Sequence, residues 1–468
     1  MEQNAQPKKT DVMEAIISLC KRRGFIFQGS EIYGGLAGTW DYGPYGVTLK
    51  QNIQNLWWKR FVDDREDMYG MDAAILMNQN VWKATGHVGG FSDPLVSCKK
   101  CKKRFRGDHL LERFNKENPS QALQSIPTGL PEIDSAIADK KIRCPECKGE
   151  LDKAKQFNMM FKTNVGASED ENSISYLRPE TAQGMFVNYK NIIDAFHPKL
   201  PFGMAQIGKA FRNEIAPRDF IFRVRELEQM EIEYLVKPTE WQGAFEQFRK
   251  EMLAYTEDVG LNSAHVHEHE ISDEDRAFYS KRTIDFEFDF PFGQSELYGL
   301  AYRTDYDLKR HSDSSGVELS YLDEETKEKF IPHCIEPSFG LGRTVLAVLS
   351  DAYTEDEMGG EKRVYMKFSP KVAPVKVAVF PLLKNKPVLV DKAREVYAML
   401  RKSLGAVEFD DNGNIGKRYR RQDEIGTPYC VTIDFDTIEK DTGVTVRNRD
   451  TGKQDRVALA DLLSVLKI

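Results

Sequence analysis

The sequence predicts an α+β fold, in which an antiparallel sheet flanked by helices is followed by a separate α/β domain at the C-terminus. A chain of 468 residues is longer than one hydrophobic core usually supports, so we expect two or three domains. Alternating Phe, Ile, Tyr and Val residues over 205–234 and 283–307 predict antiparallel strands, with acidic helical sequence between them. After Val364 the pattern becomes a strand, a helix from Lys386 to Ser403 and a short strand near Val407, which indicates a new domain.

The composition is typical of a globular protein, with 41% hydrophobic and 30% charged residues. The chain contains no apolar run of the roughly 20 residues that a membrane helix needs, and its N-terminus lacks the pattern of a secretory signal. We therefore expect a soluble, cytoplasmic protein with no membrane partner. The formal net charge of −7 argues against indiscriminate coating of DNA, so an RNA partner would have to bind local basic patches.

The N-terminal region predicts two helices separated by a glycine-rich loop. Residues 11–27 repeat apolar side chains at helical spacing, and Gly24 is a stop signal. The sequence GGLAGTWDYGPYG, from Gly34, predicts loops around a short strand, and LKQNIQNLWWKRFV, from Leu49, predicts a second helix. Residues 96–151 are polar and Lys-rich, and we interpret them as an insertion.

The segment AQIGKAFRNEIAPRDFIFRVRELEQMEIEY predicts a hairpin whose turn spans 215–219. Because residues two apart in a strand share a face, each arm should present a charged face opposite a packed one. Guanidinium groups fixed on a sheet suit a triphosphate, although a solvated, salt-bridged sheet face would show the same pattern. The residues expected to share the polar face are Arg212 and Glu214 on the first arm, and Arg223, Arg225, Gln229 and Glu231 on the second.

A second candidate anion site is the sequence IEPSFGLGRTVLAVLSDAY. Gly340 and Gly342 allow close approach to the backbone, and a helix that begins next to Arg343 favours an anion at its N-terminus. The motif lacks the third spaced glycine and the following ribose-binding acid of dinucleotide-binding folds, so that class of protein is disfavoured.

These motifs resemble those of the class II aminoacyl-tRNA synthetases. FRNE with its charged return strand is similar to motif 2 of that class, GLGR to motif 3, and WDYGPYG before a helix to motif 1. Four further signatures resemble the glycine-specific members: RPETAQG from Arg178, ELEQMEIE from Glu226, RTDYDL from Arg303 and EPSFGLGR from Glu336. The resemblance covers nearly the whole chain, including a C-terminal anticodon-binding domain. Prolyl, threonyl, seryl or histidyl enzymes should lack the EPSFG and RPETAQG pair.

The resemblance implies a homodimeric enzyme that activates glycine with ATP and Mg²⁺ and then transfers it to the 3′ end of glycine tRNA. The alternative is a noncatalytic, synthetase-like nucleic-acid-binding or polymerase-accessory subunit. Such a protein could lose Arg212, Glu214 or Arg343, and all three are present. The expected domains are a catalytic domain with motif 1 (1–95), a cysteine-bearing insertion (96–151), a catalytic part with motifs 2 and 3 and a helical insertion near 237–280 (152–365), and an anticodon-binding domain (372–468).

The resemblance also assigns the nucleotide site. It implies that Arg212 contacts the α-phosphate, Glu214 the adenine amino group and Arg343 the γ-phosphate, with Arg212 and Arg343 catalytic. Charge neutralisation and positioning then suffice for the reaction, so no catalytic base is expected. The predicted ATP-binding residues are Arg212, Asn213, Glu214, Phe222, Arg223, Val224, Arg225, Glu226, Leu227, Glu296, Leu297, Gly340, Leu341, Gly342 and Arg343.

A crowded acidic pocket would select glycine, because every competing amino acid is larger and the substrate offers only an ammonium and a carboxylate. No separate editing domain is expected. The same acids could instead be surface carboxylates, or in the case of Glu180 a charge at a helix N-terminus. The predicted glycine-binding residues are Arg106, Glu180, Leu227, Glu228, Gln229, Met230, Glu231, Glu336, Pro337, Ser338, Phe339 and Gly340.

Two CxxC pairs, Cys98 with Cys101 and Cys144 with Cys147, have the spacing of a structural four-thiolate zinc site. Free thiols remain the alternative, because 42 residues between the pairs is a long separation. His265, His267 and His269 alternate in an acidic context and favour a solvated strand over a metal site. In the C-terminal domain, a basic cluster is interpreted as an RNA surface or a solvated helix face. Its members are Lys417, Arg418, Arg420 and Arg421.

Overall fold

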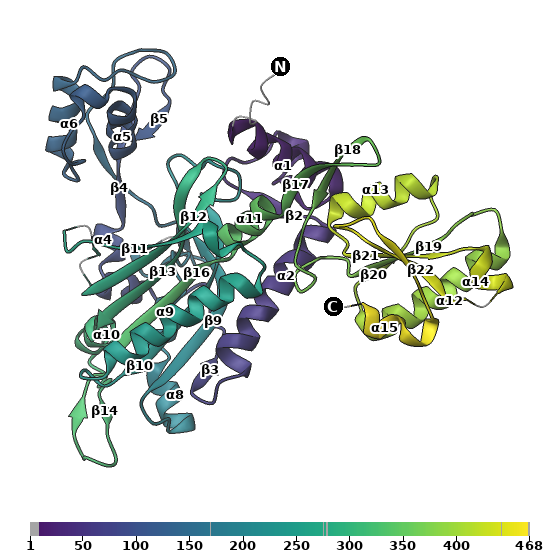
Figure 1. Cartoon of the computed structure of the whole chain (residues 1–468). Coiled ribbons are helices and arrows are strands. Elements are labelled where there is room, and N and C mark those ends of the chain that lie inside the picture. Colours follow the sequence, from purple (N-terminus) through teal and green to yellow (C-terminus); the bar gives the residue numbers. More distant parts are fainter. Residues whose placement is uncertain (1–8, 169, 275, 278, 441, 467–468) are drawn as a thin grey trace.

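The computed structural model describes residues 9–168, 170–274, 276–277, 279–440 and 442–466. Its main element is a seven-stranded sheet with the strand order β11-β12-β13-β16-β10-β9-β3 (Figure 1). All neighbouring strands are antiparallel except β3 and β9, which confirms the predicted fold class. The strands are β3 (Met68–Gly70), β9 (Phe202–Phe211), β10 (Glu226–Val236), β11 (Val266–Glu270), β12 (Arg282–Phe290), β13 (Gly293–Thr304) and β16 (His333–Gly340).

One face of this sheet packs against helices and forms the largest apolar core. The helices are α1 (Lys9–Arg23), α2 (Pro44–Trp58, continued by a π-helical turn over Lys59–Asp63), α9 (Trp241–Asp258) and α11 (Leu341–Ala352). The ring of Trp57 in α2 packs edge to face on Phe339 of β16, and the ring of Phe61 packs on the same residue at a tilt. All three side chains are fully buried. Gly24 takes a φ of 79°, which suits glycine and ends the first helix as predicted.

The other face of the sheet carries buried polar side chains. It is covered by α3 (Gln79–Ala84), α7 (Ala182–Phe186), α8 (Tyr189–Phe196) and α10 (Tyr306–Ser315). Within the segment expected as a helical insertion near 237–280, α9 packs into the main core and β11 forms the edge strand of the main sheet. This segment therefore belongs to the central fold.

The predicted short turn between the motif 2 strands is wrong. Strand β9 ends at Phe211, which pairs with Glu226 at the start of β10, so the connection runs over residues 212–225. Pro217 cannot donate a ladder hydrogen bond, and Asp219 and Phe220 have φ values of 58° and 59°. The arginines expected on two strand faces therefore project from an irregular loop.

Residues 92–158 contain a small three-stranded sheet and its own apolar cluster, which projects from the main body in Figure 1. The sheet has the order β5-β4-β6. Helices α5 and α6 pack on it through Val96, Leu110, Leu111 and Ile133. The bounds are β4 (Ser92–Ser97), β5 (Arg104–Arg106), α5 (Gly107–Glu117), α6 (Leu130–Asp139) and β6 (Lys155–Asn158).

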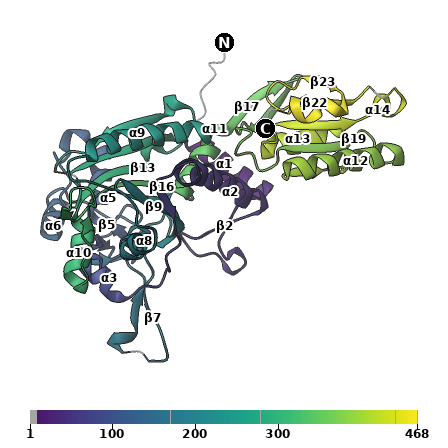
Figure 2. The ribbon, with the colours of Figure 1, turned by 90° about the horizontal axis from the view of Figure 1, so that it is seen from below.

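The C-terminal part is an α/β unit with a separate core, and Figure 2 shows it set apart from the main sheet. Its five-stranded sheet has the order β20-β19-β21-β22-β23, and the predicted strand, helix and short strand after Val364 are confirmed as β19, α12 and β20. The elements are β19 (Val377–Pro381), α12 (Pro387–Leu404), β20 (Val407–Phe409), α13 (Ile415–Ile425), β21 (Tyr429–Ile433), α14 (Phe435–Glu439), β22 (Val444–Asn448), β23 (Gln454–Val457) and α15 (Leu462–Val465).

The remaining short elements lie in connections. They are β1 (Ile26–Gln28), β2 (Trp40–Tyr42), α4 (His87–Gly90), β7 (Lys162–Asn164), β8 (Ile174–Tyr176), β14 (Tyr321–Leu322), β15 (Lys329–Phe330), β17 (Tyr353–Met358) and β18 (Glu361–Met366), with 3₁₀ turns at Glu31–Tyr33, Pro119–Gln121, Glu171–Ser173, Ser263–His265 and Leu459–Asp461. Over the described ranges, no helix combines the length and apolar composition needed to span a membrane.

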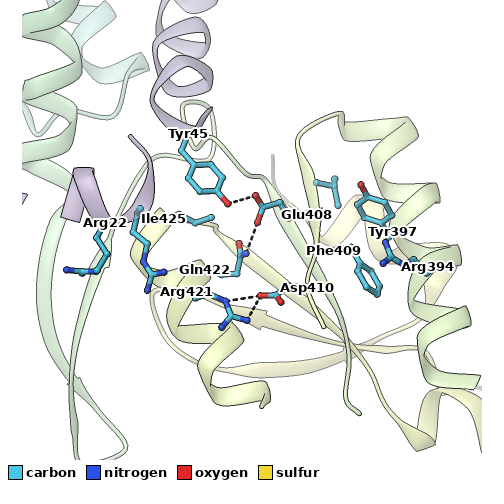
Figure 3. Close-up of a pocket in the computed structure, with 12 residues that line it drawn as sticks. Arg22, Tyr45, Arg394, Tyr397, Glu408, Phe409, Asp410, Arg421, Gln422 and Ile425 are labelled. Carbon is cyan, nitrogen blue, oxygen red and sulfur yellow. Dashed lines mark hydrogen bonds and ion pairs between the residues drawn. The ribbon is translucent and has the colours of Figure 1, made fainter. Parts of the chain in front are cut away.

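A cavity of about 520 Å³ separates helices α1 and α2 from the C-terminal unit (Figure 3). Glu408 bridges the two sides, because it accepts hydrogen bonds from Tyr45 Oη at 2.5 Å and from Gln422 Nε2 at 2.9 Å. Arg421 pairs with Asp410 at 2.6 Å in the same cavity. Of these contacts, the one from Tyr45 to Glu408 joins the two parts of the chain, and the other two lie within the C-terminal unit.

The basic cluster predicted as an RNA surface is mostly engaged within the protein. Arg418 is buried and donates to three backbone carbonyls, so it is a structural residue. Arg420 pairs with Glu361 at 2.7 Å. Arg421 pairs with Asp410. Lys417 is thus the one member of the cluster that is neither buried nor paired with an acid among the described residues.

Candidate active site

A cavity of about 630 Å³ lies above one end of the main sheet, between the motif 2 loop, β13 and the start of α11. It brings together residues that are far apart in the sequence. The predicted ATP-binding residues that line it are Arg212, Glu214, Phe222, Arg223, Val224, Glu226, Leu227, Glu296, Leu297, Gly340, Gly342 and Arg343.

Three predicted nucleotide residues do not line this cavity. Leu341 is fully buried in the apolar core, because the first turn of α11 faces the sheet there. Arg225 donates to the backbone oxygens of Glu214 and Ala37 and so holds the motif 2 loop. The backbone of Asn213 donates to the Met159 carbonyl. The positions of Arg225 and Asn213 indicate a role in the structure of the loop, and the position of Leu341 indicates a role in the core.

Two arginines place positive charge at different points of the cavity. The guanidinium of Arg343 lies 4.5 Å from the centre of the Phe222 ring and pairs with Glu296 at 2.9 Å. Attraction to Arg343 lowers the pKa of Glu296, against the opposing effect of burial. Arg212 donates through Nε to the Pro179 carbonyl at 3.0 Å and has no carboxylate partner among the described residues. Its remaining N–H groups can therefore meet an anion.

Arg106 lies at the base of the small three-stranded sheet. It pairs with Asp93 at 2.9 Å and with Asp108 at 2.5 Å, and its charge also acts on Glu214 of the motif 2 loop. In the described part of the chain, no bond joins it to the acidic residues of the predicted glycine pocket. Both of its ion-pair partners lie within residues 92–158, so Arg106 is held inside that unit in this structure.

Beyond the cavity, the inner face of the sheet forms an acidic pocket around Glu231. Gln229 and Ser338 line the cavity and also donate to Oε1 of Glu231, at 3.2 and 2.8 Å. Thr181 donates to the other carboxylate oxygen at 2.5 Å. Strand pairing of Glu231 with Ser338 produces this arrangement, and it links the cavity to the acidic pocket.

The buried cation of the pocket is Arg303, which the sequence analysis did not place in the site. Its guanidinium donates to Glu336 at 2.5 Å and makes two bonds to Asp307, at 2.8 and 2.9 Å. The ring of Tyr279 lies 4.1 Å from it. Arg303 and Asp307 both stand in the RTDYDL signature, four residues apart, and that spacing was the available signal.

Glu180 forms the third wall of the pocket. It accepts a hydrogen bond from Gln183 at 2.9 Å and lies 3.4 Å from Nε2 of His87. Burial alone would raise the pKa of Glu180, but attraction to His87 and Arg303 outweighs burial and lowers that pKa. His87 was not predicted from the sequence, because helix α4 carries no motif of its own. Gln183 was not predicted either, although it lies in the RPETAQG signature three residues after Glu180, and that spacing was the available signal.

The carboxylates outnumber the cations in this pocket. The acids are Glu180, Glu231, Glu233, Asp307 and Glu336, and the charged or chargeable groups facing them are Arg303, His87 and His311. Burial, with repulsion from Glu231 and Glu180, raises the pKa of Glu336 to about 8 despite attraction to Arg303. Burial and the charge of Glu180 also raise the pKa of Glu231. Such a site favours a ligand that brings positive charge.

Three residues predicted to bind glycine lie on the opposite face of the sheet. Met230, Pro337 and Phe339 are buried there, because side chains of neighbouring strand residues point to opposite faces. Glu228 also lies on that side of β10 and pairs with Lys50 of α2 at 2.5 Å. These four residues shape the sheet behind the pocket and do not form its wall.

The four cysteines of the two CxxC pairs lie together. Their Sγ atoms are all within 4.8 Å of one another, with Cys98 and Cys147 3.5 Å apart and Cys101 and Cys144 3.7 Å apart. Each pair forms the same turn, in which the residue after the second cysteine has positive φ: 59° at Lys102 and 56° at Lys148. Tetrahedral zinc with bonds of about 2.3 Å places its sulfur ligands about 3.8 Å apart, which fits this cluster.

The alternating histidines lie at the start of and along the edge strand β11. Each faces an acid: His265 lies 2.6 Å from Asp351, His267 3.0 Å from Asp289 and His269 3.5 Å from Glu287. Among the described residues, the groups that could hold a metal ion do not include these histidines.

Two protein families match separate parts of the chain. Residues 161–352 match the tRNA synthetase class II core domain (G, H, P, S and T), and residues 376–467 match the anticodon binding domain. The chain is 50% identical to the glycine–tRNA ligase of Clostridium acetobutylicum over 98% of this chain and 99% of the relative. It is 50% identical to that of Geobacillus thermodenitrificans, over 97% of each chain, and 51% identical to that of Lachnospira eligens, over 96% and 97%. The chain therefore belongs to the glycine–tRNA ligase family of the class II aminoacyl-tRNA synthetases.

Proposed function

We propose that this chain activates glycine with ATP and then esterifies it to glycine tRNA, with ATP in the cavity and the ammonium of glycine in the acidic pocket. The observation that carries the proposal is the contact between these two sites. Gln229 and Ser338 line the cavity and hydrogen-bond to Glu231 in the pocket. A bound amino acid would therefore have its ammonium among carboxylates and its carboxylate next to the triphosphate.

The cavity supplies what phosphoryl chemistry requires of the protein. The carboxylate of glycine attacks the α-phosphorus and pyrophosphate leaves, so negative charge must be neutralised at both ends of the triphosphate. Arg212 has free N–H groups near the Pro179 carbonyl, and Arg343 stands at the N-terminus of α11. Glu296, a carboxylate in the cavity, fits a role in holding Mg²⁺, which would neutralise phosphate charge when bound.

The pocket is suited to a small substrate. We infer that Glu180, Glu231 and Glu336 hold the ammonium and that Ser338 and Thr181 fix Glu231. Carboxylates gain nothing from contact with a larger apolar side chain, so we infer that exclusion is steric and electrostatic. A noncatalytic accessory subunit would not need the retained Arg212, Glu214 and Arg343 around a cavity, and that reading is not favoured.

Residues 372–468 are proposed to bind the anticodon region of the tRNA, while 1–95 and 152–365 form the catalytic domain and 96–151 an insertion. The match of 376–467 to the anticodon binding domain supports the first assignment. A cytoplasmic location is proposed because the substrates tRNA and ATP are used there in protein synthesis.

The first prediction concerns activation itself. In ATP–pyrophosphate exchange with Mg²⁺, glycine should support exchange, and alanine, serine, proline and threonine should not. Arg343→Ala should reduce exchange by at least about 100-fold, because removal of one transition-state charge contact typically has that effect.

Circular dichroism should show an unchanged fold in the Arg343 variant. Arg113→Ala is the matched control, because Arg113 is exposed and, among the residues that the structure describes, its one ion pair is with Glu117 in its own helix. Exchange near the wild-type rate in folded Arg343→Ala protein would disprove the proposed contact of Arg343 with the triphosphate. Exchange supported by an amino acid other than glycine would disprove the proposed glycine pocket.

A second prediction follows from the raised pKa of Glu336, about 8. Below that pH the protonated acid offers no charge to an ammonium, so KM for glycine should fall as pH rises from 6.5 through 8. Glycine binding at pH 7 should release close to one proton, since a group with this pKa is mostly protonated there.

Calorimetry in buffers of different ionisation enthalpy measures that proton release. Glu336→Gln should raise KM for glycine and abolish the release of the proton on glycine binding. Any proton that comes from glycine itself is the same for both proteins, so the difference between them reports Glu336. Unchanged proton release in Glu336→Gln protein would show that another group titrates.

We further propose a structural Zn²⁺ at the four cysteines, where it would have no open coordination position for catalysis. Gly149 supports this, because a Cβ there would lie 3.2 Å from the sulfurs of both Cys98 and Cys147. Metal analysis of protein purified under reducing conditions should find about one zinc per chain, and Cys144→Ser should lose it.

The zinc prediction has a control and a clear contrary outcome. Cys20→Ala, at a buried thiol in the main core, should keep its metal. Metal-free native protein whose four clustered thiols all react with a thiol reagent would contradict the site.

A homodimer is proposed from exposed apolar side chains in and beside motif 1. Ile32, Tyr33, Leu36 and Val47 are 90%, 87%, 56% and 46% exposed. Large exposed apolar side chains are typical of a protein interface, and the resemblance leads us to expect the partner copy at motif 1.

Sedimentation at micromolar concentration should give a dimer for the wild type and a monomer for the double variant Ile32→Asp, Tyr33→Asp. Val317→Asp, at another exposed valine, is the matched control and should stay dimeric. A monomeric wild type, or a dimeric double variant, would contradict this interface.

A further inference from the structure

Glu233 is a fully buried carboxyl group that the proposed mechanism does not use. It lies on β10, two residues from Glu231, so both side chains point to the polar face of the sheet. Glu231 pairs with Ser338 and Tyr234 with Ile335, and this register sets Glu233 opposite Glu336. Carboxylate oxygens of Glu231, Glu233 and Glu336 lie within 4.8 Å of one another.

The three acids differ in what stabilises their charge. Glu231 accepts hydrogen bonds from Thr181, Gln229 and Ser338, and Glu336 accepts one from Arg303. Among the described residues, Glu233 accepts one hydrogen bond, which the thiol of Cys334 donates to Oε2 at 2.9 Å. Its Oε1 has no hydrogen-bond partner there. A thiol is a weak donor, so the environment of Glu233 is the least able to support an anion.

The groups around Glu233 supply one cation for three acids. Strand β10 contributes Glu231, β16 contributes Glu336 and Cys334, and β13 contributes Arg303, which also acts on two other acids of the pocket. Strand β9 places the uncharged Met204 opposite Glu233. Carboxylates this close in a buried site cannot all ionise, because like charges oppose one another and burial opposes each charge. The pKa of Glu233 is raised well above its ordinary value by burial and by Glu336.

We propose that Glu233 is a positioning residue for glycine: it stays protonated when glycine is bound and donates a hydrogen bond from Oε1 to Glu336, which holds that carboxylate toward the ammonium. The inference rests on the proposed glycine pocket. It explains why an acid stands where a charge is unfavourable, because the protonated form is a donor and Oε1 of Glu233 has no other hydrogen-bond partner among the described residues. When glycine binds, Glu336 gives up its proton and Glu233 keeps its own.

The test compares Glu233→Gln with Glu233→Met in glycine-dependent pyrophosphate exchange between pH 6.5 and 8.5. The Gln variant keeps a neutral donor and should keep KM for glycine within about threefold of the wild type, whereas the Met variant lacks a donor and should raise it about tenfold. KM for ATP, measured at saturating glycine, should be unchanged in both. Glu257→Met, at an exposed position of α9, is the substitution control.

The pH profile separates a neutral Glu233 from an ionised one. If Glu233 is neutral in the wild type, Glu233→Gln leaves the midpoint of the glycine KM profile in place. If Glu233 is an anion, its removal lowers the pKa of Glu336 and moves the midpoint to lower pH by about one unit or more, which would overturn the proposal.

Other outcomes are equally decisive. Equal glycine KM in the Gln and Met variants would show that the donor is not needed, and a Gln variant as impaired as Met would show that the acid must ionise; either result overturns the proposal. If the Met variant does not fold, infrared spectra of the glycine-bound wild type and of glycine-bound Glu233→Gln test whether Glu233 is protonated. The proposal requires a protonated carboxyl band in the wild type that is absent in the variant, and it is overturned if no such band is found. A normal glycine response in Glu336→Gln would instead refute the pocket on which the inference rests.

Discussion

The guanidinium of Arg303 is the interaction on which the pocket depends. Five acids lie on or against the inner face of the main sheet, where burial opposes each negative charge. Arg303 makes three hydrogen bonds to Asp307 and Glu336 from one buried position. Its planar fork binds Asp307 through two parallel N–H donors and still donates to Glu336, a bidentate geometry that the compact ammonium of a lysine does not offer. Without it, Asp307 and Glu336 would be buried unpaired.

Strand β10 contributes to both the acidic pocket and the apolar core, because its side chains alternate between the two faces of the sheet. In β10, Glu231 and Glu233 face the pocket, while Met230, Ile232 and Tyr234 pack in the apolar core. This alternation is visible in the sequence, and the strand and its faces could be predicted from it. The side chains of Met230, Pro337 and Phe339, which the resemblance implies to bind glycine, lie on the other face, because the same alternation turns every second residue of these signatures away from the pocket.

Other parts of the site could not be found from local pattern. The motif 2 hairpin was predicted with a short turn, but Pro217 and the positive φ of Asp219 and Phe220 form a longer loop, in which Phe220 packs on Trp40. His87 of α4 reaches Glu180 from a distant part of the sequence, and only the tertiary fold brings these two groups together. Arg418 was expected on a surface, yet its side chain holds carbonyls of the surrounding chain. Short-range spacing predicts elements and motifs, whereas partners depend on the tertiary fold.

The two neighbouring sites differ in charge, and this has a consequence for catalysis: cations and acids are equal in number along the cavity, whereas acids outnumber cations in the pocket. Arg212 and Arg343 stand around the cavity, and the acids lie beyond Gln229 and Ser338. On the proposed assignment, an amino acid between them can bind in only one direction, because its ammonium is attracted to the acids and its carboxylate to the arginines and the α-phosphate. Orientation of the nucleophile is thus built into the sheet before ATP binds, so binding energy need not be used to reorganise the site. The buried carboxylates, costly for the fold, are explained by this orientation.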